Sequence, residues 1–376
     1  MGCVKSKCPC VSRAAKANDS GYPMTSPASS AVQTPDEPKP SFRSLYDLSY
    51  DKLGEGASTT VFAATHKETY VRVAVKCFAK AEMQLEDEDD LCREVDILRG
   101  LSHPDIIRFV DFFDEPNYYF LVTELVEGGE LFDRLVQKEV YSERDAQQLV
   151  RALLGVVQYL HQRNIVHQDL KVHVMLTCQD ETTHSLENIL LVTSDDDTTI
   201  KLCDFGFAQY DTDNQLSQKW GSPDYLAPEI ITQPTYGRQV DIWSAGVITF
   251  ILLSGCAPFV GDTNAELLAA IQLGKIHFQP EYWHDVSPAA QSFVRRMLVV
   301  DPNERATVDD LLQDPWLARP ASSASFKSTI EELRRLNARK KFKSAVKTVQ
   351  AAVAFRASLH GRPTALSEAT TDTSDV

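Results

Sequence analysis

Residues 167–171 read HQDLK and residues 187–191 read ENILL, with the segment VHVMLTCQDETTHS at positions 172–185 between them. The outer pieces combine His, Asp, Lys, Glu and Asn, while the inserted segment starts apolar and continues polar. Lengthening a loop about fourfold costs only ~1.2 kcal/mol of closure entropy, so a fold can accommodate the insertion. The chemistry of this stretch therefore depends on whether its second piece returns to the first.

Three further motifs flank this stretch in chain order. An apolar strand pattern at residues 199–202 precedes Asp204, whose carboxylate is the hard oxygen ligand that suits Mg²⁺. Upstream, paired glycines let the backbone approach a phosphate closely, and a second apolar strand ends in the cation Lys76. The motifs are LGEGASTTV at residues 53–61, VAVK at residues 73–76 and CDFG at residues 203–206.

Joined across the insertion, the two pieces resemble the H-R-D-L-K-x-E-N catalytic loop of eukaryotic protein kinases, and the three flanking motifs fit the same family. The resemblance spans about residues 46–317. It implies an α+β, bilobal protein kinase fold, with a small, mainly β N-lobe and a larger, mainly α C-lobe. It also implies Asp169 as the catalytic base, Asn188 and Asp204 as Mg²⁺ ligands, and ATP as the phosphoryl donor.

The resemblance further implies how the nucleotide is held. Lys76 pairs the phosphates and a glutamate of the long N-lobe helix, which the LCREV pattern at residues 91–95 identifies as Glu94. The residues implied to bind ATP are Gly54, Glu55, Gly56, Val61, Ala74, Lys76, Glu94, Glu124 and Val126.

C-lobe motifs resemble the calcium/calmodulin-dependent kinase group: GGELF at residues 128–132, DIWSAGV at 241–247, LLSG at 252–255 and DPWL at 314–317. This implies serine/threonine phosphorylation, with Lys171 neutralising the transferred phosphoryl group. It assigns Glu130 and Ser222 to the protein substrate, Glu130 contacting a basic residue near the target hydroxyl. Glu130 fits equally well as an acid favoured by a helix dipole.

Two residues that regulate many related kinases are replaced. Gln168 stands where an arginine grips an activation-loop phosphate, and Gln218 stands where the phosphorylated threonine of this group lies. Both halves of the switch are missing, so activity is predicted not to require activation-loop phosphorylation.

The chain divides into four segments by composition. Its net charge of −15 argues against nucleic-acid binding, and the acidic run at residues 86–90 is predicted to be a solvated loop. The predicted segments are a disordered acylated tether (1–43), the kinase domain (46–318, with N-lobe 46–126, C-lobe 127–318 and insert 172–185), an autoinhibitory and calmodulin-binding helix (327–356) and a disordered tail (357–376).

The N-terminus reads MGCVKS, which fits the pattern for myristoylation of Gly2. Cys3 is a palmitoylation candidate, and a second acyl chain or basic residues are needed for stable anchoring. We therefore expect the protein at the cytoplasmic face of the plasma membrane or an endomembrane, and partly in the cytoplasm. The last residues, SDV, fit the carboxyl-terminal ending that PDZ domains bind.

Residues 329–343, TIEELRRLNARKKFK, resemble the autoinhibitory and calmodulin-binding segment of calmodulin-dependent protein kinase II. They equally resemble that of the kinase-like scaffold of the membrane-associated guanylate kinases. Apolar residues share one face among cations, as a calmodulin target requires, and Thr329 aligns with the autophosphorylated threonine of calmodulin-dependent protein kinase II. A membrane-surface helix is the other interpretation. Truncation after about residue 324 is expected to remove inhibition. The predicted apolar anchors are Phe342, Val346, Val349 and Phe355.

Two functions remain open from the sequence. One is a membrane-anchored serine/threonine kinase that phosphorylates proteins with basic residues near the target and responds to Ca²⁺-loaded calmodulin. The other is a catalytically weak scaffold, because the insertion is expected to displace Asn188 and a shift of about 1 Å can cost around 10²-fold in rate. The insertion itself reads either as a genuine one or as an unspliced segment.

Overall fold

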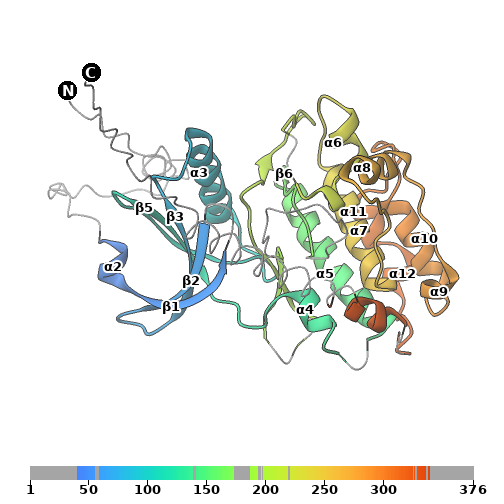
Figure 1. Cartoon of the computed structure of the whole chain (residues 1–376), viewed down its shortest axis with the longest axis horizontal. Helices are drawn as coiled ribbons and strands as arrows, with labels where there is room; N and C mark the ends of the chain where they lie inside the picture. Colours follow the sequence, from blue (N-terminus) through green and yellow to red (C-terminus); the bar gives the residue numbers. More distant parts are fainter. Residues whose placement is uncertain are drawn as a thin grey trace, which may run out of the picture.

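The computed structural model describes residues 40–55, 59–138, 141–172, 187–193, 196, 198–218, 221–324, 326, 328–335 and 338. They form a β-sheet with one long helix, beside a larger helical part (Figure 1). Across these ranges no helix combines the length and hydropathy that a membrane span requires. The bilobal α+β fold expected from the sequence is confirmed.

The N-lobe is built on an antiparallel sheet of order β1-β2-β3-β5-β4. Strand β3 buries side chains on both faces, because Val73 and Val75 enter one apolar cluster and Phe78 enters the other. This double burial fixes the register of the strand that carries Lys76. The strands are β1 (Tyr46–Glu55), β2 (Thr59–His66), β3 (Arg72–Ala79), β4 (Phe109–Asp114) and β5 (Tyr118–Glu124).

The acidic run at residues 86–90 was predicted to be a solvated loop, and this prediction is wrong. It forms the first turns of helix α3 (Leu85–Gly100), where a capping box joins Gln84 and Asp87. Carboxylates in a first turn interact favourably with the helix dipole and with unsatisfied N–H groups, so the run starts the helix. Its charge is thus compatible with helix formation.

The N-lobe also begins earlier than the predicted tether boundary at residue 43. Helix α2 (Phe42–Leu45) buries Phe42, whose ring stacks on Tyr46 and on Phe120 with centroid distances of 5.4 and 4.3 Å. Burying a phenylalanine contributes roughly 1.5–3 kcal/mol, which offsets part of the entropy cost of ordering the short segment that carries it.

The C-lobe packs around helix α7, which is buried along its whole length. Arg305 and Glu229 form a buried bidentate ion pair beside it, with N–O distances of 2.7 and 2.9 Å. The helices are α4 (Leu131–Leu135), α5 (Glu143–His161), α6 (Pro228–Thr232), α7 (Gln239–Ser254), α8 (Asn264–Leu273), α9 (Pro280–Trp283), α10 (Pro288–Met297), α11 (Val308–Leu312) and α12 (Pro315–Ala318), with a 3₁₀ turn at Pro223–Tyr225.

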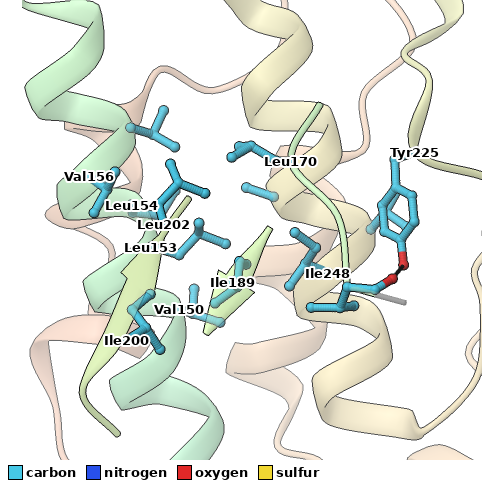
Figure 2. Packing of buried hydrophobic residues seen from close by; sticks show 14 of the residues in the cluster. Val150, Leu153, Leu154, Val156, Leu170, Ile189, Ile200, Leu202, Tyr225 and Ile248 are labelled. Atoms are coloured by element: carbon cyan, nitrogen blue, oxygen red, sulfur yellow. Dashed lines mark hydrogen bonds between the residues drawn. The ribbon is translucent and has the colours of Figure 1, made fainter. Parts of the chain in front are cut away.

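Two small sheets support the catalytic loop. Strand β6 (Ile165–Val166) pairs with β9 (Gln209–Tyr210), and β7 (Ile189–Leu191) pairs with β8 (Ile200–Leu202). Figure 2 shows Leu170 of the loop among the buried side chains around α5, β7, β8 and α7. The loop therefore rests on the C-lobe core.

A C-terminal segment, residues 326–335, packs on the C-lobe beyond the predicted domain end. Residues 328–335 are helical, and the helix lies beside the other C-lobe helices (dark red in Figure 1). Phe326, Ile330 and Leu333 are at most 3% exposed and belong to the main core cluster. We call the described residues of this stretch, 326 and 328–335, the docked segment.

Candidate active site

Lys76, Glu94 and Asp204 meet between the lobes. The Lys76 Nζ atom lies 3.2 Å from Glu94 Oε1 and 2.9 Å from Asp204 Oδ1. Strand β3, helix α3 and the CDFG stretch each supply one member, so the triad joins both lobes. The predicted pairing of Lys76 with Glu94 is present in the structure.

The charges of Lys76 and Asp204 support each other, although burial raises the pKa of Glu94. Burial alone favours a neutral Lys76, but the Asp204 and Glu94 carboxylates outweigh it and raise the pKa of the amine. Burial also opposes ionisation of Asp204, yet Lys76 outweighs it and lowers the pKa of that carboxyl to about 2. Asp204 is thus an anion at neutral pH, the form in which a carboxyl group binds Mg²⁺.

Asp169 is held at both carboxylate oxygens. Its Oδ2 atom lies 2.6 Å from Lys171 Nζ and accepts a 3.0 Å hydrogen bond from Asn188 Nδ2. Its Oδ1 atom accepts from the Ser222 amide at 3.1 Å and the Ser222 hydroxyl at 3.2 Å. The predicted catalytic residues therefore converge on one carboxylate, and Ser222, which we assigned to the substrate, contacts it directly.

The insertion does not displace Asn188, contrary to our expectation. Asn188 Nδ2 also donates to the Asp169 carbonyl at 2.7 Å, and the Asn188 carbonyl accepts from the Cys203 amide at 2.9 Å. Val172 begins the predicted insert but is buried, and its carbonyl accepts from the Tyr225 hydroxyl. Residues 173–186 lie outside the described residues. Core packing on both sides thus returns the chain to the catalytic loop.

A donor pair for a cation is available beside Asp169. The Asn188 Oδ1 atom is buried and has no hydrogen-bond partner among the residues that the structure places. A buried carbonyl oxygen without a partner is costly, and coordination of a cation would satisfy it. Together with the Asp204 carboxylate, it forms an oxygen set of the kind that Mg²⁺ prefers.

Helix α7 and helix α5 fix the catalytic loop through residues that the sequence analysis missed. Asp241 accepts hydrogen bonds from the backbone amides of His167 and Gln168 at 3.0 and 2.9 Å. The same carboxylate lies 2.9 Å from His161 Nε2. Asp241 is completely buried, so it anchors the loop from within the core. The DIWS motif contained this residue, but its spacing from the loop gave no sign of the contact.

Most of the residues predicted to bind ATP lie on strands of the N-lobe sheet or just after its fifth strand. Val61 lies opposite Lys76, and Ala74 lies opposite Thr123. The Glu124 side chain is engaged elsewhere, since it lies 2.7 Å from Lys201 Nζ and accepts from the Arg108 amide. Gly54 and Glu55 end strand β1, Val126 packs partly buried against the core, and Gly56 lies outside the described residues.

Glu130 immediately precedes helix α4 and contacts the second catalytic-loop piece. Its Oε1 atom accepts from the Glu187 amide at 3.5 Å, and its backbone bridges Leu190. Its side chain provides no cap hydrogen bond to α4, but its place directly before the helix remains compatible with the helix-dipole alternative. A role in substrate binding remains an expectation.

Thr329 is placed by the structure in a position that the sequence did not suggest. It is 1% exposed, and its hydroxyl donates to the Leu253 carbonyl at 2.9 Å. It cannot accept a phosphoryl group while the docked segment stays in place, because its only hydroxyl is buried. The other regulatory and lipidation residues lie outside the described residues: Gly2, Cys3, Phe342, Val346, Val349 and Phe355.

Comparison with known proteins agrees with this geometry. Residues 48–317 match the family described as protein kinase domain. The chain is 37% identical over 298 residues to calcium/calmodulin-dependent protein kinase type 1 of Macrobrachium nipponense, covering 78% of this chain and 82% of that one. It is 40% identical over 268 residues to myosin light chain kinase A of Dictyostelium discoideum, covering 71% and 86%.

A mammalian relative is similar over the same region. The chain is 37% identical over 279 residues to calcium/calmodulin-dependent protein kinase type 1B of Rattus norvegicus, covering 74% of this chain and 77% of the relative. Family match, relatives and site geometry agree. The chain belongs to the protein kinase family and is a serine/threonine kinase of the calcium/calmodulin-dependent group.

Proposed function

We propose that this kinase uses ATP and Mg²⁺ to phosphorylate serine or threonine beside basic residues, at a membrane surface and under the control of Ca²⁺-loaded calmodulin. The observation that carries the catalytic part is the convergence of Lys171, Asn188 and Ser222 on Asp169. It supports an active enzyme over a weak scaffold, because that alternative depended on a displaced Asn188.

The catalytic residues divide the work of phosphoryl transfer. Asp169 accepts the proton of the substrate hydroxyl, and its carboxylate is held in place by Asn188 and Ser222. Lys171 lies close enough to Asp169 to offset negative charge that gathers at the transferred group. Lys76, fixed by Glu94, holds the phosphates of ATP.

Asn188 and Asp204 are the residues that would hold Mg²⁺. A Mg²⁺ ion held there would supply positive charge that offsets the charge of the phosphates. Both residues lie next to strands that pack on the C-lobe core, so their backbone positions are fixed without a bound cation. Glu130, at the start of α4, supports a preference for basic substrates.

Control by calmodulin rests on the basic helix and on what the relatives' names state. Residues 329–343 carry the basic pattern, and the structure describes only the start of this helix, in the docked segment. Moving an inhibited state from 1:99 to 99:1 needs about 5.5 kcal/mol of differential affinity. A nanomolar ligand that binds only the released helix has about 12 kcal/mol of binding free energy, which exceeds this requirement.

Calmodulin is expected to raise the peptide phosphorylation rate of the full-length chain in a Ca²⁺-dependent manner. Calorimetry should detect a Ca²⁺-dependent complex with a peptide of residues 329–356, because its apolar face would fill the calmodulin groove. Phe342→Asp should abolish that complex, whereas Ser344→Asp adds the same charge about half a turn away and should preserve it. Absence of any complex would favour the membrane-surface interpretation of the helix.

Membrane attachment through Gly2 is proposed from the first six residues. Gly2→Ala should move the full-length protein into the soluble fraction of lysed cells, because no myristoyl chain can be attached. Cys3→Ser should leave only weak attachment, since one myristoyl chain gives binding of about 10⁴ M⁻¹. Gly21→Ala is the matched control in the same segment. Retention of the Gly2→Ala protein on membranes would identify another anchor.

A further inference from the structure

Gln168, next to the catalytic aspartate, connects three parts of the chain through its side chain. It is 4% exposed, and its Nε2 atom donates to the Phe207 carbonyl at 2.8 Å. Its Oε1 atom accepts from the Tyr236 hydroxyl at 2.6 Å. The catalytic loop, the start of the activation segment and the approach to helix α7 therefore meet at one amide group.

Tyr236 extends these contacts to the later part of the activation segment. Its hydroxyl also contacts the Gln218 carbonyl, so the single phenolic proton is shared between two acceptors. Its backbone exchanges two hydrogen bonds with Leu216, of 3.1 and 2.8 Å. The Gln209 side chain donates to the Gln218 side chain and is the last member of this set of contacts. We call Gln168, Gln209, Gln218 and Tyr236 the amide–tyrosine network.

Every member of this network is uncharged. Burial, and then Asp241, raise the pKa of Tyr236 to about 12, so its hydroxyl keeps its proton at any physiological pH. Neutral amide and phenol groups satisfy one another here without a phosphate or a guanidinium. The two replacements seen in the sequence, at positions 168 and 218, are thus members of one physical unit.

The network lies directly behind the residues that contact Asp169. Gly221 has a φ of 114°, and a Cβ atom there would lie 3.0 Å from the Gln168 carbonyl. The next residue, Ser222, gives both of its hydrogen bonds to Asp169 Oδ1. Contacts at residues 207 and 218 therefore hold both ends of residues 208–217, and the second contact lies four residues before Ser222.

We propose that Gln168 and Tyr236 are positioning residues that hold the activation segment in its productive place by neutral hydrogen bonds, without phosphorylation of that segment. The inference rests on the kinase activity of this site. It assigns no chemical step to either residue. Its consequence is that the protein-substrate side of the reaction depends on the network, while ATP binding by Lys76 and Glu94 does not.

The test compares Tyr236→Phe with the full-length wild-type kinase, both treated with phosphatase. The variant keeps the ring and loses only the hydroxyl. We expect kcat/KM for a basic peptide to fall about tenfold, the effect of losing one buried hydrogen bond of ordinary strength. The KM for ATP should stay unchanged. Tyr210→Phe, an exposed tyrosine in the same segment, is the matched control and should behave as wild type.

A double-mutant cycle separates a shared network from two independent structural effects. Gln168→Met removes both amide contacts at similar volume, and adding Tyr236→Phe to it should cause a smaller loss than Tyr236→Phe causes in the wild type, because only the contact with Gln218 is then left to lose. Fully additive losses would overturn the proposal. Equal changes in the KM for the peptide and the KM for ATP would also overturn it. Phosphatase treatment that lowers the wild-type rate would also overturn it.

A readout without catalysis keeps the test independent of the kinase assay. Amide hydrogen exchange of residues 207–222 should be faster in Tyr236→Phe than in wild type, with unchanged exchange in helix α7. A wild-type protein without measurable activity would refute the proposed function. The exchange measurement would still show whether the amide–tyrosine network holds residues 207–222 in place. Unchanged exchange in residues 207–222 would refute the network.

Discussion

Asp204→Ala is expected to reduce peptide phosphorylation by the full-length kinase on the order of 10³-fold or more, the scale of losing a preorganised electrostatic contact in an active site. The substitution removes the anionic oxygen ligand for Mg²⁺ and leaves Lys76 with Glu94 alone, at 3.2 Å. A steady-state assay with a basic peptide measures the loss. Lys76→Met, which removes the cation that meets the phosphates, should have a similar effect.

The pKa of Asp204 gives this prediction a pH condition. Its pKa lies at about 2 in the folded chain, below the usual value of 3.8, so its interaction with Lys76 stabilises the fold above the unfolded pKa and is lost as pH falls toward 2. At neutral pH the aspartate is ionised, and Asp204→Ala removes a full charge. Rates compared near pH 7 therefore report the loss of the anion.

A matched control exists in the N-lobe. Asp114 and Lys80 form another carboxylate–ammonium pair, which lies outside the cleft, and Asp114→Ala should leave the rate close to that of wild type. Full activity of Asp204→Ala would contradict the assignment of the site. Loss of activity in both variants, with altered circular dichroism, would instead indicate damage to the fold.

The candidate catalytic residues could be proposed from the sequence because each lies in a short motif. Asp169, Asn188 and Asp204 could be named although residues 172–185 interrupt the loop, and the structure brings Asn188 into contact with Asp169. Their mutual positions could not be predicted, because Asp241 in helix α7 holds the loop through contacts that cross more than 70 residues of chain. Sequence patterns report local geometry, whereas these contacts depend on how the core packs.

The docked segment shows a second reason why the sequence could not predict the structure. Phe326, Ile330 and Leu333 recur at helical spacing, which predicts an apolar helix face but does not say what covers it. The same face suits calmodulin, a membrane or the kinase core. The structure assigns these three residues to the core, and Gly255 marks the contact, since a Cβ there would lie 2.7 Å from the Thr329 carbonyl.

Truncation after residue 324 is therefore expected to destabilise the kinase rather than simply activate it, which corrects our expectation from the sequence. The cut removes three core side chains, each contributing roughly 1.5–3 kcal/mol, together comparable with the 5–15 kcal/mol that holds a typical domain folded. It also removes the hydrogen bond of the Phe326 amide to Tyr141, at 2.7 Å, and those of Arg334 to two main-chain carbonyls.

Truncation after residue 338 should have the opposite outcome, because it keeps the docked segment and removes the anchors proposed for calmodulin. We expect this protein to melt like the full-length chain and to phosphorylate peptide at the calmodulin-activated rate without calmodulin. The protein ending at residue 324 should melt at a much lower temperature or fail to accumulate in soluble form. Leu333→Ala in the full-length chain should cost about 2–5 kcal/mol, which tests the packing without a truncation. A stable, constitutively active protein ending at residue 324 would show that the docked segment is a removable inhibitor, since only an element outside the folding unit can be lost without destabilising it.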